Sequence, residues 1–389
     1  MRRSNPTLDR PRRRQAGQIV VVAALAIITM IAGISLILEG GNAYAHQRVA
    51  QNASDAVANA GATVLAQRLG GAIKTDADVL AATDSVAASN ELTTYDAYYT
   101  DVKGALLTPA GTTTTNVSAA ARVGPADGDS TIPPNTQGVQ AGGSQQFDTT
   151  FARAIGIDQF TASAIATSVT GALTGGNFLP VIFPVNIVDC ETNGDLGIGD
   201  TSWVLSQPDG SDADPYPDGQ EYIIPLCKTG GGSFMILDLD QSLGGPPNNC
   251  DDEVTNPPAI QFANFPVDIA SDNGNNCAKE MVDEVNALHG KVVLVPICDG
   301  DCVTAGGSNA TYHVIRVAAL YLDYMSDENS NSNPLCQNHT GASGQSLVTI
   351  RGNGSSSCIA GWFVRYMTSG PVGAGDVIGS AAIGIQLVR

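Results

Sequence analysis

The N-terminal part of the chain contains twenty consecutive uncharged residues, from Ile19 to Leu38, in which only Thr29 and Ser35 are polar. A helix needs roughly 20 such residues to span the hydrocarbon core of a bilayer, whereas the apolar part of a cleaved signal peptide usually has about 7 to 15. The length of the run therefore favours a permanent membrane anchor. The competing observation is Ala43-Tyr44-Ala45, an A-x-A pattern of the kind that signal peptidase recognises.

Charges around this run indicate its orientation and exclude one class of partner. Six arginines and a single acid, Asp9, precede the run, so by the positive-inside rule the N-terminus lies in the cytoplasm and everything after Leu38 lies outside it. The first fourteen residues carry a net charge of +5, so the total of -19 leaves about -24 on the remaining chain. Such an acidic surface repels phosphate backbones and suits solubility or cation binding, so we expect no nucleic-acid partner.

All eight cysteines lie in the exported part of the chain. An even number in an oxidising compartment predicts disulfides; four bridges allow roughly a hundred connectivities, of which pairs of sequence neighbours are the simplest. A zinc site is the weaker alternative, because Cys298 and Cys302 are spaced C-x3-C and no second such pair completes four ligands. The disulfide candidates are Cys190, Cys227, Cys250, Cys277, Cys298, Cys302, Cys336 and Cys358.

A second helix signal follows the apolar run. From Ala43 to Leu69 the chain has no proline and is rich in alanine, and small residues recur at spacings of four and three, which predicts one helical face. Side chains this small let another backbone approach closely, so we expect helix packing there. As one helix, residues 18–69 would form a rod about 78 Å long, with Gly40-Gly41 as the place for a bend. The predicted packing face consists of Val49, Ala53, Ala56, Ala60 and Val64.

Residues 16–62, AGQIVVVAALAIITMIAGISLILEGGNAYAHQRVAQNASDAVANAGA, carry a family resemblance. The residues that carry it are Gly17 and Gln18 before the apolar run, Glu39 and Gly41 after it, then Tyr44, Arg48 and the block Gln51, Ala53, Asp55 and Ala56. This segment resembles the N-terminal segment of TadG-like proteins of the Flp (tight adherence) pilus system. Two positions depart from the family pattern: Glu39 replaces the usual aspartate, and Ser54 stands where alanine is common.

The same resemblance bears on processing. Type IV prepilins are cut after a glycine that is followed, five residues on, by glutamate. Counted from Gly17, that fifth residue is Val22, and the apolar run contains no glutamate. We therefore expect the arginine-rich tail to be retained, as in an anchored minor or accessory component rather than the major pilin.

The pattern of apolar residues between positions 72 and 172 predicts a small α+β domain. Period-two alternation is typical of a half-buried strand, and phenylalanines or isoleucines four apart are typical of a helix. The expected elements are a strand over 95–100, a Pro/Gly-rich loop over 124–138, a short helix carrying Phe147, Phe151 and Ile155, and a strand over 160–169. The phrase FARAIGIDQFTASAIA, residues 151–166, also resembles the corresponding segment of TadE/TadG-like proteins.

Residues 173–389 consist of short apolar runs separated by Gly, Asn, Asp and Pro, which predicts a β-rich, disulfide-stapled extracytoplasmic domain. One helix is expected at 277–289, and the runs 291–298 and 312–325 resemble a strand pair in the outer domains of some Tad-like proteins. The expected fold class is thus α+β. Its parts are a basic cytoplasmic tail (1–17), a transmembrane helix (18–40), a stalk helix (41–71), the small α+β domain (72–172) and the β-rich domain (173–389).

No catalytic motif stands out. The sequence lacks a G-x-S-x-G elbow, H-E-x-x-H, a phosphate loop and a dinucleotide fingerprint, its four histidines are scattered, and the D-x-S-x-S metal motif of some larger TadG-like chains is missing. We therefore expect neither an enzyme nor a small-molecule substrate.

The resemblance implies a single-pass cell-membrane component of a Flp/Tad pilus assembly or surface-attachment system. We expect it to act by helix packing and head contacts, with the membrane and other pilus or pilin-like subunits, including a second copy, as partners. The alternatives are an anchored or secreted hydrolase and a cleaved, secreted calcium-dependent binding protein.

One acidic segment, DCETNGDLGIGD at 189–200, has the spacing of an EF-hand calcium loop. The candidate Ca²⁺ ligands are Asp189, Glu191, Asn193, Asp195 and Asp200, with Gly194 at the turn position. Asp200 is one methylene shorter than the usual bidentate glutamate, and the flanking residues resemble strands rather than helices. An ordinary acidic surface turn is the alternative.

Overall fold

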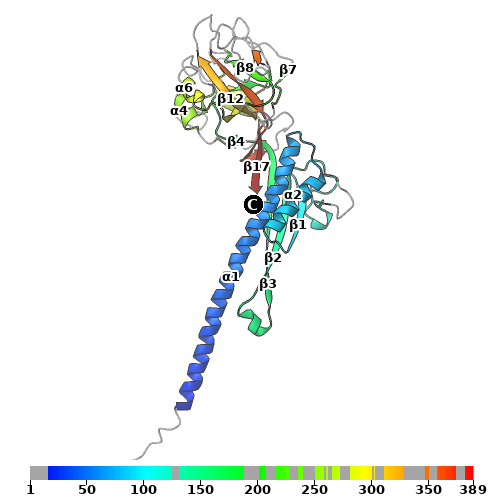
Figure 1. Ribbon diagram of the computed structural model, residues 1–389, viewed down its shortest axis with the longest axis vertical. Helices are drawn as coiled ribbons and strands as arrows, with labels where there is room; N and C mark the ends of the chain where they lie inside the picture. Colours follow the sequence, from blue (N-terminus) through cyan, green and yellow to red (C-terminus); the bar gives the residue numbers. More distant parts are fainter. Residues whose placement is uncertain are drawn as a thin grey trace, which may run out of the picture.

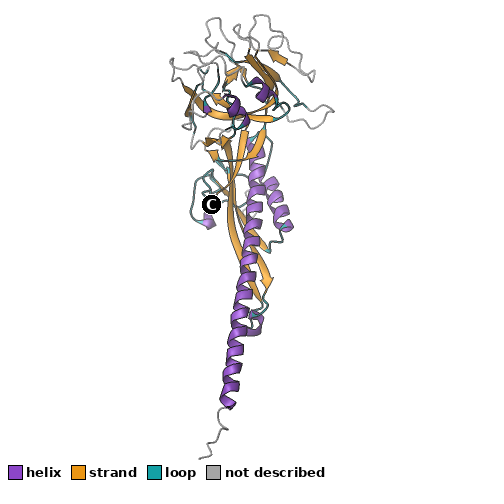
Figure 2. Cartoon of the chain, turned by 90° about the vertical axis from the view of Figure 1, so that its left-hand side faces the viewer, coloured by secondary structure: helices purple, strands orange, loops and turns teal. Residues whose placement is uncertain are grey.

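A single long helix runs from one end of the molecule to the junction with a β-rich head (Figures 1 and 2). The computed structural model describes residues 16–124, 131–187, 201–206, 216–227, 235–239, 250–257, 260–261, 265–271, 281–299, 302, 311–327, 347–349, 357–373 and 382–388. Helix α1, Ala16–Leu69, has 54 residues and continues without interruption through Gly40-Gly41. The two helix signals of the sequence therefore belong to one rod.

The upper half of α1 lies on a sheet. The strands of this sheet are, in spatial order, β1 (Thr94–Thr100), β2 (Gly138–Asp148), β3 (Gln159–Leu173), β17 (Ala382–Val388) and β15 (Tyr366–Ser369), and β16 (Val372–Gly373) also pairs with β3. Helix α2 (Asp76–Ser89) packs beside α1. We call α1 from Glu39 onward, α2 and this sheet the stalk.

The chain leaves the stalk after β3 and returns to it at its end. Strand β17 pairs antiparallel with β3 and parallel with β15, so the last strand of the sequence lies inside the stalk sheet (Figure 1). The head is thus built from the segment between β3 and β15.

The head contains a seven-stranded sheet. Its strands are, in spatial order, β13 (Leu347–Thr349), β8 (Glu221–Pro225), β14 (Ser357–Val364), β12 (Thr311–Asp327), β11 (Val292–Cys298) and β5 (Phe183–Pro184), with β10 (Val267–Ala270) paired to β12. Smaller elements are the pairs β4 (Gly175–Gly176) with β9 (Ile260–Gln261) and β6 (Asn186–Ile187) with β7 (Thr201–Ser202), and the helices α4 (Cys250–Thr255) and α6 (Val282–Asn286). The expected strand pair 291–298 and 312–325 is β11 and β12, paired antiparallel.

Large apolar side chains fill the head core. Trp362 has no exposed surface, and Tyr222, Tyr312 and Phe178 are each 1% exposed. The two tyrosine hydroxyls accept hydrogen bonds from the backbone N–H groups of Val204 and Met235, both at 2.9 Å, which removes the cost of burying them. The α+β class, the long apolar helix and the disulfide-containing β-rich head agree with the sequence prediction.

Two predicted helices differ from the structure. Phe147 belongs to β2 and pairs with Phe160 of β3, and only Ala152–Ile155 forms a short 3-10 helix, η3. The spacing of four arises here because Phe147 lies near the end of β2, whereas Phe151 and Ile155 lie in the connection that follows it. The helix expected at 277–289 is α6, Val282–Asn286; residues 277–280 lie outside the described part of the chain.

Candidate functional site

The stalk half of α1 presents small residues to β2 and β3. Val57 and Ala58 have no exposed surface and pack against Ala141 of β2 and Ala166 of β3. Because the facing side chains are small on both surfaces, the helix lies close to the strands. The buried side of α1 in the stalk is therefore used for packing on the sheet of the same chain.

Gly61 marks how close the helix and the sheet are. A Cβ atom at Gly61 would lie 2.8 Å from Cγ2 and 3.1 Å from Cβ of Val139. Real Cβ atoms do not approach other carbons this closely, so even alanine at this position would force Val139 or α1 to shift. The glycine is thus required by the helix–sheet contact and not by a turn.

Polar side chains of α1 bind the backbone of β2 and β3. The Ser54 hydroxyl accepts a hydrogen bond from the Gly143 N–H at 3.1 Å and donates one to the Ala164 carbonyl at 3.1 Å. Gly143 and Ala164 are register partners, so the buried serine satisfies one polar group of each strand. Gln47 donates to the Ser163 carbonyl at 2.6 Å. These two hydrogen bonds of Ser54 are a structural reason for serine at a position where alanine is common in the family pattern.

The lower end of the β2–β3 hairpin is fastened to α1 by Glu39. Both carboxylate oxygens accept a hydrogen bond from the Thr150 N–H, at 3.2 and 3.3 Å, and one accepts from the Phe151 N–H at 3.1 Å. Farther along α1, the His46 ring stacks on Phe147 with centroids 4.1 Å apart. The sequence marks Glu39 only as an acid that ends an apolar run; its contact with residues 111 and 112 positions away has no local signal.

The five residues of the predicted packing face have different surroundings. Ala53 is 1% exposed and Val64 is 8% exposed, and Val64 shares a cluster with Val79 of α2. Val49 is 45% exposed, and Ala56 and Ala60 are half-buried. The inner part of this face is therefore covered by the chain itself. Contact with another subunit stays a prediction for Val49, Ala56 and Ala60.

The apolar run of α1 has no covering within the described structure. Its large hydrophobic side chains are 55–76% exposed, and α1 is the one helix among the described residues that is long and apolar enough to cross a membrane. Exposure of so much apolar surface in water costs roughly 25 cal/mol per Å². The segment is therefore a candidate membrane anchor.

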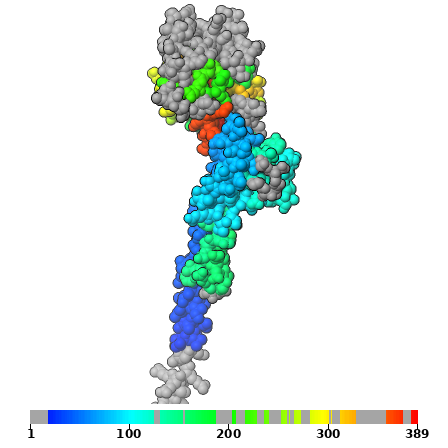
Figure 3. All heavy atoms as spheres, turned by 45° about the vertical axis from the view of Figure 1, so that its right-hand side comes forward, coloured from blue at the N-terminus to red at the C-terminus, as the bar shows by residue number. Residues whose placement is uncertain are grey.

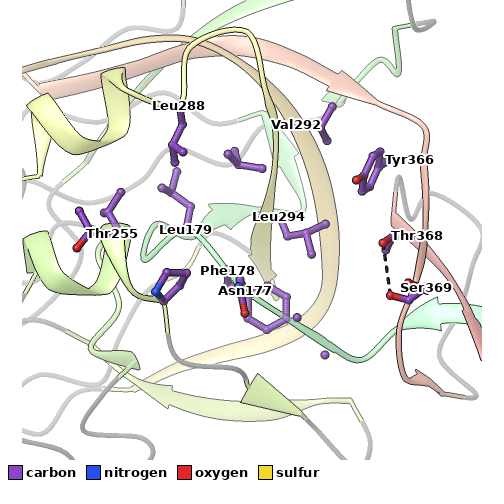
Figure 4. Close-up of a pocket in the computed structure, with 15 residues that line it drawn as sticks. Asn177, Phe178, Leu179, Thr255, Leu288, Val292, Leu294, Tyr366, Thr368 and Ser369 are labelled. Atoms are coloured by element: carbon purple, nitrogen blue, oxygen red, sulfur yellow. Dashed lines mark hydrogen bonds between the residues drawn. The ribbon is translucent and has the colours of Figure 1, made fainter.

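A cavity of about 600 Å³ lies where the head meets the stalk. Figure 4 shows Leu179, Leu288 and Leu294 around it, with Tyr366 and Thr368 of β15 on one side. Among the described residues that line the cavity, Tyr366 has the only titratable side chain. Among the described residues of this lining, the hydroxyl groups of Thr368 and Ser369 have no carboxylate, histidine or lysine beside them.

Three histidines are described, and they lie apart. His46 is on α1, His289 follows α6 and lies beside Asp323, and His313 of β12 lies 2.7 Å from a carboxylate oxygen of Asp268. His339 lies outside the described residues. Within the described part of the chain, no group of three or more His, Cys, Asp or Glu side chains is placed to hold a metal ion.

The head also buries an acid that the sequence analysis missed. Glu221 begins β8 and has no exposed surface. Burial, together with the neighbouring carboxyl of Asp323, raises the pKa of Glu221 to about 8. In the sequence, the one indication that Glu221 is buried is its position directly before the apolar residues Tyr222-Ile223-Ile224.

Cys298 and Cys302 form a disulfide, so the zinc alternative fails for this pair of sequence neighbours. Cys227 and Cys358 are also disulfide-bonded, and none of the cysteines in the described part of the chain is free. The side chains of the other four candidates lie outside the described residues: Cys190, Cys250, Cys277 and Cys336.

The candidate calcium loop at 189–200 also lies outside the described residues. Its two flanks are described, and they are strands as expected: β6 and β7 pair antiparallel, with Asn186 opposite Ser202 and Ile187 opposite Thr201. Ile187 and Thr201, the described residues that flank this segment, are therefore direct partners in the pair.

Comparison with known proteins gives one match. Residues 17–64 match the family model described as "Putative Flp pilus-assembly TadE/G-like". No curated protein and no solved structure matches the chain. The matched segment runs from the start of the apolar run to the part of α1 that packs on β2 and β3, and it agrees with the resemblance drawn from the sequence. The matched segment thus contains the candidate membrane anchor and the part of α1 next to it.

Proposed function

We propose that this chain is a single-pass, membrane-anchored, pilin-like component of a Flp pilus assembly or surface-attachment system. Its N-terminus lies in the cytoplasm, and the stalk and head lie outside. The observation that carries the proposal is the continuity of α1: the segment matched by the pilus-assembly family includes both the exposed apolar run and the part that docks on the stalk sheet. A rigid helix of this kind holds a head at a fixed distance from the membrane.

Assembly contacts are proposed for the outer side of α1. Val49, Ala56 and Ala60 form the part of the small-residue face that the chain does not fully cover. Small side chains allow a neighbouring helix to approach closely, and the loss of that approach weakens association. The proposed partners are other pilin-like subunits, including a second copy of this chain.

Replacement of Ala56 by leucine is expected to abolish or strongly reduce surface pili while leaving the melting temperature of the full chain unchanged. The added side chain points to a half-exposed position, so it blocks a partner and not the fold. Pili are counted by electron microscopy in cells that carry the variant in place of the wild type, with chain abundance measured by immunoblot.

Ala53→Leu is the matched comparison. Ala53 is 1% exposed, so overpacking there is expected to cost about 1–3 kcal/mol of folding free energy and to lower the melting temperature. Normal piliation with Ala56→Leu at wild-type abundance would contradict the proposed packing role.

A calcium site at 189–200 is part of the proposal. Supporting it are the ligand spacing, the acidity of the exported chain and the antiparallel pair β6–β7 at the ends of the segment. We expect calorimetric titration of the full chain in detergent to give calcium-dependent heat with a dissociation constant on the order of 10⁻⁴ to 10⁻³ M, as for extracellular sites. The heat should vanish in Asp189→Ala with Asn193→Ala. Absence of heat from the wild-type chain, or equal heat from the double variant, would end the proposal.

A further inference from the structure

The tip of the β2–β3 hairpin lies beside α1 at the level where the apolar run ends. The connection between β2 and β3 contains η3 and is held to the helix by Glu39, which is 9% exposed and is the residue directly after Leu38. Figure 1 shows this tip as the lowest part of the stalk sheet, alongside α1. Figure 3 shows its surface against the lower part of the helix.

The groove between the tip and α1 continues down the apolar run. It has a volume of about 710 Å³, and its walls are Ile28, Ile31, Ala32, Ser35, Leu36, Glu39, Gly40 and Ala43 on the helix and Phe151, Ala152, Ile157 and Phe160 on the hairpin. Twenty residues of helix span about 30 Å, the thickness of the hydrocarbon core. If Ile19–Leu38 spans the bilayer, Ile28 lies near its midplane and Leu36 near its outer edge.

The hairpin tip carries exposed apolar side chains at the height of the outer edge of the bilayer. Phe151 is 38% exposed and Ile157 is 40% exposed, although both have the helix beside them. The charged residues of the tip are paired with each other: Arg153 Nε lies 3.2 Å from an Asp158 carboxylate oxygen, and both side chains are exposed. Such a mixture of apolar and charged groups is typical of segments that lie at a membrane–water interface.

Four backbone N–H groups of the tip have acceptors within the chain. The N–H groups of Gly156 and Ile157 donate to the carbonyls of Arg153 and Ala152, and those of Thr150 and Phe151 donate to Glu39. An N–H group without a partner would cost several kcal/mol in lipid. Glu39 thus supplies the acceptors that the turn itself lacks.

We propose that this hairpin tip is a second membrane contact, in which Phe151 and Ile157 enter the outer leaflet and the groove beside α1 holds an acyl chain of a phospholipid of that leaflet. The inference rests on the proposed membrane anchoring of α1. Lipid is the occupant because the groove is continuous with the lipid-facing surface of the apolar run. In addition, Ser35 and Glu39 are the only polar side chains among the described residues of its walls, and both are already hydrogen-bonded within the chain.

A second contact has a mechanical consequence. A single spanning helix is free to rotate about its axis and to tilt, and flanking anchors restrict both motions. With the tip in the outer leaflet on one side of α1, the stalk sheet takes a fixed direction relative to the membrane. Each subunit would then present the outer side of its stalk helix in a defined orientation to its neighbours.

Fluorescence quenching by lipids brominated in their acyl chains tests the inference. The full chain is placed in nanodiscs as a single copy, and Phe151→Trp, Ile157→Trp, Met30→Trp and Tyr98→Trp are compared with the wild type, whose two tryptophans lie in the head. We expect Phe151→Trp and Ile157→Trp to be quenched at least about half as strongly as Met30→Trp, because interfacial segments reach about 5–10 Å into the headgroup and acyl region. Tyr98→Trp, on β1, should behave as the wild type.

The outcomes separate this inference from the anchoring proposal. Quenching at Met30→Trp without quenching at either tip position overturns the inference and leaves the anchor intact. Absence of quenching at Met30→Trp overturns the anchoring itself. Tip tryptophans that are unquenched in single-copy discs and shielded only in discs with two copies would assign the groove to a second subunit and also overturn the lipid assignment.

Discussion

A chain that ends at residue 381 is expected to lose the folded stalk, although the deleted residues follow the whole head in the sequence. Deletion removes β17, which lies between β3 and β15 in the stalk sheet. Strand β15 then loses its pairing with β17, β3 keeps only β2 and the short β16 as partners among the described strands, and the cluster of Ile383 with Ala66 and Ala172 is opened. We expect amide hydrogen exchange of the full chain in detergent to lose protection in β3 and in the last turns of α1.

Two point variants in the same strand refine this test. Ile383 is 1% exposed, so Ile383→Ala should lower the free energy of unfolding by about 2–5 kcal/mol. Leu387 is 43% exposed, and Leu387→Ala should cost less than about 1 kcal/mol. A truncated chain with wild-type protection in β3, or equal effects of the two alanine variants, would contradict the role assigned to β17.

Local periodicity predicted much of the fold. Alternating residues gave the strands at 95–100 and 160–169, and the apolar run with its alanine-rich continuation gave α1. It could not predict that the last strand returns to pair with β3, because a pairing across more than 200 residues leaves no local pattern. The same limit applies to Phe147, whose spacing is helical but whose partner, Phe160, lies across a hairpin.

The candidate site shows a related limit. Small residues such as Ala53 and Gly61 predict that another backbone comes close, but they do not say whether it belongs to a helix or to a sheet. Here β2 and β3 occupy the inner part of that face. Glu39 was likewise visible as an acid at the end of an apolar run, yet its role depends on Thr150 and Phe151, which reach it only through the fold.

A rise in pH from about 4.5 to 8 is expected to weaken the head through Glu221. Its pKa is raised from 4.5 to about 8 in the folded state, first because the carboxyl is buried and then because Asp323 is close. Between these two pH values the unfolded chain has released the proton while the folded chain retains it. The free energy of unfolding therefore falls as the pH rises from about 4.5 to 8, by at most about 1.4 kcal/mol per pH unit.

Glu221→Gln is expected to remove most of this pH dependence and to raise the melting temperature at pH 8, because the amide is neutral in both states. The expected gain at pH 8 is about 2 kcal/mol or more, since folding of the wild-type chain at that pH requires Glu221 to take up a proton that the unfolded chain has released. Asp283→Asn, an exposed acid on α6, is the control and should keep the wild-type pH profile. Melting curves of the full chain between pH 5 and pH 8 measure the pH dependence of the melting temperature for the wild type and for each of the two variants. If Glu221→Gln melts with the same pH profile as the wild type, the buried carboxyl does not set the pH dependence of the head between pH 5 and pH 8.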